Sequence, residues 1–198
     1  MNKENPSSSR LKSELRRARW VVTTPALAGR GKNIKNVTGN RISLRKIKGS
    51  DKRYFAKWWR DKSLLKITSG ELKRISDQEV SKYFTRISKD AKGKQYMITV
   101  SGEAIGHIAL ERRKNGWYEI QIVIGEKKQQ NKGYGIKAIK QLLGKTQKEG
   151  INKIYLEVRP NNLRAIRAYE KCGFQNTGIK RYPNNLYLPK TIKMVLRT

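Results

Sequence analysis

The segment that starts at Arg41 has apolar positions with the regular spacing of folded secondary structure. In "RISLRKI" apolar and polar residues alternate, which is typical of a strand. In "DKRYFAKWWRDKSLLKIT" the aromatic residues have helical spacing behind Asp51, a residue type that favours helix N-caps. A second helix is predicted from Ser76 to about Ile87. The pattern therefore predicts a strand followed by two helices.

The second half of the pattern contains more strands than helices. Three strand candidates, "YMITV", "AIGHIALE" and "WYEIQIVIG", are separated by "SGE" and "RRKNG", which are typical of hairpin turns. A helix from about Ile136 to Gly150, a buried strand "KIYLEV" and a helix in "RPNNLRAIRAYEKCGF" follow. Two strands, near Phe174–Lys180 and Thr191–Leu196, end the chain. This order predicts a mixed α/β domain with about four helices on a largely antiparallel sheet.

Composition divides the chain into two parts. Residues 1–40 contain nine Lys and Arg against two Glu, and Pro and Gly interrupt any periodicity, which predicts a basic and mostly flexible arm. Residues 41–198 are expected to form one domain. The arm either orders on an anionic partner or is an ordinary solvated tail.

Charge is the most unusual bulk property of the sequence. It has 46 Lys and Arg against 15 Asp and Glu, a formal net charge of +31. The electric field of such a charge attracts polyanions, including RNA and ribosomes. The same composition equally fits a protein whose basic residues only cover solvated faces. No apolar run is long enough to cross a bilayer and no secretory signal is evident, so we expect no membrane contact. One cysteine, Cys172, excludes an internal disulfide, and we expect a cytoplasmic protein.

The stretch "QQNKGYGIKA" fits two kinds of phosphate-binding loop. Gly133, Gly135 and Ala138 match the G-x-G-x-x-A fingerprint of dinucleotide-binding domains. That fingerprint should follow its strand directly within repeated βαβ units, whereas here residues 125–132 intervene and hairpins precede. The sequence favours the other interpretation, a Q-x-x-G-x-G loop over residues 130–135, where helix N-terminal amides bind an anion.

Two segments together resemble the central motifs of a known enzyme superfamily. They are "EIQIVIGEKKQQNKGYGIKAIKQLL" and "INKIYLEVRPNNLRAIRAYEKCGF". The pair is similar to the GNAT acyl-CoA N-acyltransferases, and most like the branch of ribosomal-protein N-terminal acetyltransferases and spermidine acetyltransferases. The resemblance extends from Arg41 to Arg197 and implies a largely antiparallel, twisted sheet of six to seven strands flanked by about four helices.

The resemblance implies acetyl-CoA as the cofactor. The glycine loop would hold its pyrophosphate, the backbone at a strand end would pair with its pantetheine amides, and an asparagine on the later helix would contact it. The cofactor-binding residues so implied are Ile122, Val123, Ile124, Gln130, Asn131, Lys132, Gly133, Tyr134, Gly135 and Asn162. Without the resemblance, the strand residues indicate core packing and Asn162 a helix cap, and both roles are compatible with cofactor contact.

Two residues match catalytic positions of the family. Tyr169 corresponds to the tyrosine that protonates the departing thiolate, and a phenol of pKa about 10 can do so. Glu119 is the candidate base that takes a proton from the acceptor ammonium, directly or through water; the alternative is an outward-facing carboxylate on an alternating strand. A backbone amide near Val123 can polarise the thioester carbonyl. We expect no metal site, because His107 has no ligand cluster near it in sequence, and Cys172 is typical of packing.

The acceptor is a primary amine whose identity the residues leave open. By resemblance its site lies between the first two helices and the loop "RYPNNLYLP", where Trp58, Trp59, Tyr182 and Tyr187 can form walls, although both tryptophans also fit the core. Because acidic residues are few, we expect a protein α-amine, in particular of a ribosomal protein, more than a polyamine or another small amine, unless local carboxylates override the net charge. A different class stays open: a basic RNA- or ribosome-binding protein with a relic fold. Monomer and homodimer are both compatible with the sequence.

Overall fold

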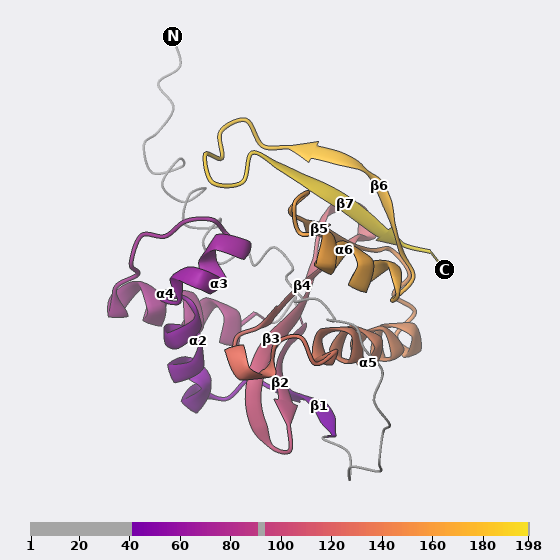
Figure 1. The fold of residues 1–198 in the computed structure, drawn as a ribbon. Coiled ribbons are helices and arrows are strands. Elements are labelled where there is room, and N and C mark those ends of the chain that lie inside the picture. Colours follow the sequence, from indigo (N-terminus) through magenta and orange to yellow (C-terminus); the bar gives the residue numbers. More distant parts are fainter. Residues whose placement is uncertain (1–40, 91–93, 198) are drawn as a thin grey trace, which may run out of the picture.

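The computed structural model describes residues 41–90 and 94–197, so the predicted arm over residues 1–40 lies outside the described residues. A seven-stranded sheet with the order β1-β2-β3-β4-β5-β7-β6 forms the centre of the fold (Figure 1). The strands are β1 (Ile42–Lys46), β2 (Lys94–Val100), β3 (Glu103–Arg112), β4 (Tyr118–Ile124), β5 (Ile154–Val158), β6 (Phe174–Arg181) and β7 (Lys190–Leu196). The helices are α2 (Lys52–Trp58), α3 (Lys62–Ile67), α4 (Asp77–Ser88), α5 (Tyr134–Lys148) and α6 (Leu163–Glu170). The mixed α/β class and the strand number predicted from the sequence are confirmed.

All neighbouring strands are antiparallel except β4 and β5, which are parallel. Both predicted hairpins are present. Ser101 and Gly102 make the β2–β3 turn with φ of 50° and 86°, and Asn115 and Gly116 make the β3–β4 turn with φ of 57° and 74°. Paired positive φ values give such turns the twist that antiparallel strands require, and Gly and Asn adopt them at low cost.

The first predicted helix is divided into two, so the described part of the chain has five α-helices rather than about four. Asp61 begins α3 as its N-cap, where its carboxylate accepts hydrogen bonds from the Ser63 and Leu64 N–H groups. The sequence suggested that Asp51 caps α2, but its side chain makes no capping hydrogen bond. Its carboxylate instead accepts two hydrogen bonds of 2.7 Å from Arg45. None of the helices over residues 41–90 and 94–197 has the length and apolar character that a bilayer crossing requires.

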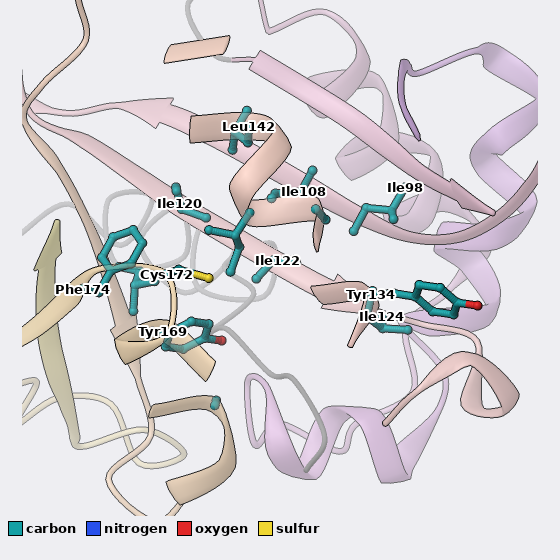
Figure 2. Close-up of a cluster of buried hydrophobic side chains, with 14 of the residues drawn as sticks. Ile98, Ile108, Ile120, Ile122, Ile124, Tyr134, Leu142, Tyr169, Cys172 and Phe174 are labelled. Carbon is teal, nitrogen blue, oxygen red and sulfur yellow. The ribbon is translucent and has the colours of Figure 1, made fainter. Parts of the chain in front are cut away.

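Two apolar cores lie on opposite faces of the sheet. Helices α5 and α6 cover one face, and α2 and α4 cover the other (Figure 1). Figure 2 shows the first core, in which Ile120, Ile122 and Ile124 of β4 pack against α5 and α6. Val123 points the opposite way and belongs to the second core. Because successive side chains of β4 point to opposite faces of the sheet, this strand contributes to both apolar cores.

Candidate active site

The parallel pairing of β4 and β5 ends while both strands continue. The ladder between β3 and β4 runs as far as Gly106 and Ile124, whereas the ladder between β4 and β5 ends at Ile120 and Leu156. Beyond Ile120, the edge of β4 that faces β5 has no ladder partner on β5 in the described chain. The predicted cofactor strand, residues 122–124, lies in this unpaired stretch. Its peptide groups can therefore pair with a ligand that enters between the two strands.

The glycine loop joins the end of β4 to the start of α5. The side-chain amide of Gln130 donates a 2.8 Å hydrogen bond to the Ile124 carbonyl, so this side chain anchors the loop instead of pointing outward. Asn131 and Gly133 have φ of 68° and 76°, and Gly133 is the N-cap of α5. A Cβ on Gly133 would meet no atom within 4 Å, so its backbone conformation, not lack of space, requires glycine. The N-terminal amides of α5, a helix of 15 residues, lie next to this loop.

The other three predicted loop residues are Lys132, Tyr134 and Gly135. Lys132 is exposed and donates a 3.2 Å hydrogen bond to the Gln129 side chain. Tyr134 is 5% exposed and belongs to the core on the α5 face, so its backbone is the part that a ligand could reach. Gly135 is buried in the first turn of α5. The loop therefore offers mainly backbone groups.

Helix α6 lies beside the loop. Its N-cap is Asn162, whose side chain accepts a 3.2 Å hydrogen bond from the Ala165 N–H, as the cap interpretation predicted. Arg164, in the first turn, donates a hydrogen bond to the Asn131 side chain and so links α6 to the glycine loop. Burial lowers the pKa of Arg164 below its ordinary value. Nothing in the sequence marks Arg164 for this contact, because its partner is 33 residues away.

Tyr169 is fully buried on α6, with 0% exposure. Its ring meets Phe174 edge to face, with the centroids 6.5 Å apart. Figure 2 shows the hydroxyl turned away from Phe174, and Tyr169 belongs to the same core as Ile122 and Ile124. The structure therefore places Tyr169 and the unpaired end of β4 in one cluster.

Glu119 lies on β4 just before the ladder with β5 ends. It points to the face opposite Ile120, is 2% exposed, and accepts hydrogen bonds of 2.7 Å from Arg113 Nε and 3.4 Å from the Tyr155 hydroxyl. Burial and the nearby Glu119 raise the pKa of Tyr155 to about 12, so this phenol stays protonated at neutral pH. Burial alone would lower the pKa of Arg113, but Glu119 and Glu111 raise it above its ordinary value. Glu119 is therefore a buried carboxylate held by an arginine, not the solvated side chain of the alternative interpretation.

Glu157, on the same face of the neighbouring strand β5, is a second buried carboxylate, with 2% exposure. It accepts hydrogen bonds from the Tyr182 hydroxyl at 2.5 Å and from the Thr191 hydroxyl at 2.7 Å. Lys180 adds an ammonium 3.0 Å from Oε1, although its side chain is 47% exposed. Glu157 was not among the predicted site residues; the sequence marks it only through the alternation of "KIYLEV", which places Tyr155 and Glu157 on one face.

The predicted acceptor walls divide into core and surface. Trp58 and Trp59 are 0% and 4% exposed and belong to the core under α2, in agreement with the simpler interpretation. A Cβ on Gly125 would lie 2.2 Å from the Trp58 indole, so this glycine lets α2 approach the end of β4. Tyr187, in contrast, is half exposed on the loop between β6 and β7.

The only histidine and the only cysteine serve packing. His107 is 2% exposed, and burial lowers its pKa to about 3, so its ring is neutral at physiological pH. Its Nε2 lies 2.9 Å from Gln95 Oε1, an acceptor, so Nε2 carries the ring proton. Cys172 is 8% exposed and burial raises the pKa of its thiol to about 11, which opposes a nucleophilic role.

Comparison with known proteins adds the family. Residues 41–175 match the model of the acetyltransferase (GNAT) domain. The chain is 26% identical to an aminoglycoside N(6')-acetyltransferase type 1 of Klebsiella pneumoniae over 178 residues, 81% of this chain and 88% of that protein. It superposes on the spermidine N-acetyltransferase of Vibrio cholerae, solved with CoA and spermine, with a TM-score of 0.68 and 21% identity. The superposition covers 79% of this chain and 95% of that chain.

A third likeness is to AAC(6')-Ib solved with paromomycin and acetyl-CoA. Here the TM-score is 0.66 with 22% identity, and 78% of this chain and 92% of that chain are covered. At these identities the two structural likenesses show a shared fold, and the family model covers more than half of the sequence. The chain therefore belongs to the GNAT acetyltransferase domain family and is an acetyl-CoA-dependent N-acetyltransferase that acts on amines.

Proposed function

We propose that this enzyme acetylates a small polybasic amine, such as a polyamine or an aminoglycoside. The observation that carries the proposal is the ion pair of Glu157 with Lys180, because a buried carboxylate here already binds an ammonium. Lys180 is half exposed and can move into solvent, so an ammonium of the acceptor can take its place. Glu119 lies on the same face of the adjacent strand, so two buried carboxylates can attract two ammonium groups of one acceptor.

This choice revises the expectation from net charge. The sequence has few acidic residues, but two of them are concentrated on one face of β4 and β5. Local carboxylates act at short range on a bound ligand, whereas the surface field of distant lysines is screened within about 10 Å at ordinary salt. The similarity to an aminoglycoside acetyltransferase also supports a small amine more than a ribosomal-protein N-terminus.

The residues of the glycine loop and of β4 fit acetyl-CoA. The backbone of residues 122–124 is open toward β5, and the α5 N-terminus with residues 130–135 offers amides and the Lys132 ammonium to a pyrophosphate. Asn162 and Arg164 border the same loop from α6. Bound there, acetyl-CoA supplies an acetyl group activated as a thioester.

Two side chains then move protons. An ammonium has no lone pair at neutral pH, so Glu119 accepts a proton from the acceptor, directly or through water, and leaves a nucleophilic amine. As the C–N bond forms and the C–S bond breaks, Tyr169 would donate its hydroxyl proton to the departing thiolate and regain a proton, through solvent, from the nitrogen of the new amide. A backbone amide of residues 122–124 donates to the carbonyl oxygen on which charge develops.

The test is a panel of acceptors assayed by thiol release from acetyl-CoA. Spermidine, spermine and kanamycin form the polybasic group; N-terminal peptides of ribosomal proteins and monoamines such as butylamine form the comparison groups. We expect polybasic amines to have kcat/KM at least tenfold above those of monoamines, because one additional ion pair discriminates by about that factor. Peptide turnover without turnover of any polyamine or aminoglycoside would overturn the proposal, and no turnover of any amine would overturn the enzyme assignment itself.

A further inference from the structure

Arg159, the residue after β5, connects three segments that are far apart in the sequence. Its Nε donates a 2.9 Å hydrogen bond to the Thr68 carbonyl at the end of α3. Its Nη2 donates a 2.9 Å hydrogen bond to the Tyr187 carbonyl, in the loop of residues 182–189 between β6 and β7. One guanidinium thus joins the end of β5, the end of α3 and this loop.

Arg159 has an unusual charge environment. Within residues 41–90 and 94–197 it has no carboxylate partner, since backbone carbonyls accept its hydrogen bonds. Burial lowers the pKa of this guanidinium below its ordinary value. The Arg159 guanidinium is planar and donates to a main-chain carbonyl of each of two segments. Its rigid geometry therefore fixes the position of both segments at once.

Gly70 shows how close the three segments are. A Cβ on Gly70 would lie 2.3 Å from Arg159 Nη2 and 2.7 Å from the Tyr187 carbonyl oxygen. The φ of Gly70 is 79°, and its N–H donates a 2.7 Å hydrogen bond to the Leu65 carbonyl. Glycine is therefore needed both for the backbone turn after α3 and for the approach of the loop.

The loop of residues 182–189 is held from β5 at two points. Glu157 binds the Tyr182 hydroxyl near its start, and Arg159 binds the Tyr187 carbonyl near its end. Glu157 and Arg159 are two residues apart, so their side chains point to the same side of the strand, and both reach the loop. Near the second point the loop exposes the side chains of Leu186 and Tyr187, which are 89% and 50% exposed.

We infer that Arg159 is a positioning residue for the amine acceptor. With Gly70 and the Tyr187 carbonyl it forms a clasp that holds the end of α3 against the loop of residues 182–189. The loop reaches Glu157 through the Tyr182 hydroxyl, and Arg159 ties the end of α3 to the same loop, so the clasp fixes the position of the loop beside the proposed acceptor carboxylate. The inference rests on the proposed function, because it assigns an acceptor to this side of β5.

The experiment compares two variants that open the clasp from different segments, Arg159→Met and Gly70→Ala, with the exposed Arg181→Met as the matched control. Spermidine and kanamycin are the acceptors. We expect both clasp variants to raise the acceptor KM about tenfold, the worth of one or two lost hydrogen bonds to a charged group. We expect kcat and the acetyl-CoA Kd, measured by calorimetry, to change less than about twofold, because β4 and α5 are untouched. The double variant should be no worse than the poorer single variant.

Amide hydrogen exchange without any ligand gives an independent readout. Arg159→Met should accelerate exchange in residues 67–72 and 182–189 together, while exchange in α5 and α6 stays at the wild-type rate. Unchanged acceptor KM in both variants would overturn the inference, as would equal losses of acetyl-CoA and acceptor affinity or unchanged exchange in either segment. A wild-type protein that turns over none of the amines would instead overturn the proposed function, so the two failures are distinguishable.

Discussion

The two faces of the sheet around β4 and β5 make their sites in different ways. In the proposed function, the cofactor side is the face covered by α5 and α6, with the glycine loop and residues 122–124. It presents backbone groups from short continuous segments, held by contacts such as Gln130 to Ile124. In the proposed function, the acceptor side is the opposite face, with Glu119, Glu157 and the loop of residues 182–189. It presents side chains that meet from separate strands and loops.

This difference has a consequence for specificity. Backbone amides recognise a ligand that every family member shares, and they are insensitive to most substitutions of side chains. A side-chain network can be changed one residue at a time, so the acceptor can vary while the cofactor stays the same. We therefore expect substitutions on the two sides to separate cofactor effects from acceptor effects.

The largest expected effect comes from Tyr169, the proton donor of the proposed mechanism. Tyr169→Phe keeps the ring against Phe174 and removes the proton donor, so we expect kcat to fall by about a hundredfold with little change in acetyl-CoA Kd. Steady-state kinetics and calorimetry measure the two quantities. Tyr96→Phe, a partly buried tyrosine beside the same core, is the control. Unchanged kcat in Tyr169→Phe would remove this tyrosine from the mechanism.

Glu157→Gln should affect the acceptor side alone. The amide keeps the size of the side chain but loses the charge that binds Lys180, so the KM of spermidine should rise by about ten- to thirtyfold. The acetyl-CoA Kd should stay within about twofold, because Ile122 and its neighbours are not contacted. The exposed Glu103→Gln is the control, since it removes the same formal charge. Equal effects in the two variants would mean that net charge, not Glu157, attracts the acceptor.

Gly106→Ala should affect the cofactor side through the backbone. A Cβ at Gly106 would lie 2.2 Å from the Val123 carbonyl oxygen, so β3 and β4 must separate where the cofactor strand is unpaired from β5. We expect a loss of about 1–2 kcal/mol in the free energy of unfolding, together with weaker acetyl-CoA binding. Urea denaturation and calorimetry measure both.

Gly144→Ala is the matched control for this backbone effect. A Cβ there meets no atom within 4 Å on α5, so we expect a stabilisation of about 0.5–1 kcal/mol. If Gly106→Ala weakened spermidine binding and not acetyl-CoA binding, the division of the sheet into two sides would be wrong.

The contrast also explains what could be predicted from the sequence. The glycine loop, Asn162 and Tyr169 lie in two continuous motifs, and strand and helix periods placed most elements correctly. The break between α2 and α3 was missed because Asp61 continues a polar stretch and looks like an ordinary solvated residue until its capping role is seen.

The acceptor side was harder to predict because its contacts join residues distant in sequence. Arg159 meets Thr68 across 91 residues and Tyr187 across 28 residues. Glu157 meets Thr191 across 34 residues. No periodicity encodes such pairs, since they follow from the crossover that brings β7 between β5 and β6. Net charge could not reveal these pairs for the same reason: it counts acidic residues but does not show which of them are buried together.

The smallest expected effect concerns pH and comes from His107, under α2 on the acceptor side. Burial lowers the pKa of His107 to about 3. Its Nε2 is hydrogen-bonded to the Gln95 side chain, which in turn donates a hydrogen bond to Asp90. The unfolded chain binds a proton near pH 6.5, and the native ring does not, so native stability is complete above pH 6.5 and falls as the pH decreases toward 3. Between pH 7 and 5.5 this group should remove about 1.3 kcal/mol from the free energy of unfolding.

The variant His107→Gln tests this pH dependence. Glutamine does not titrate, so the free energy of unfolding of the variant, measured by urea denaturation at each pH, should change less over that interval than that of the wild type. Equal slopes for the variant and the wild type would mean that the ring takes up a proton in the native state, and that the apolar layer under α2 admits charge.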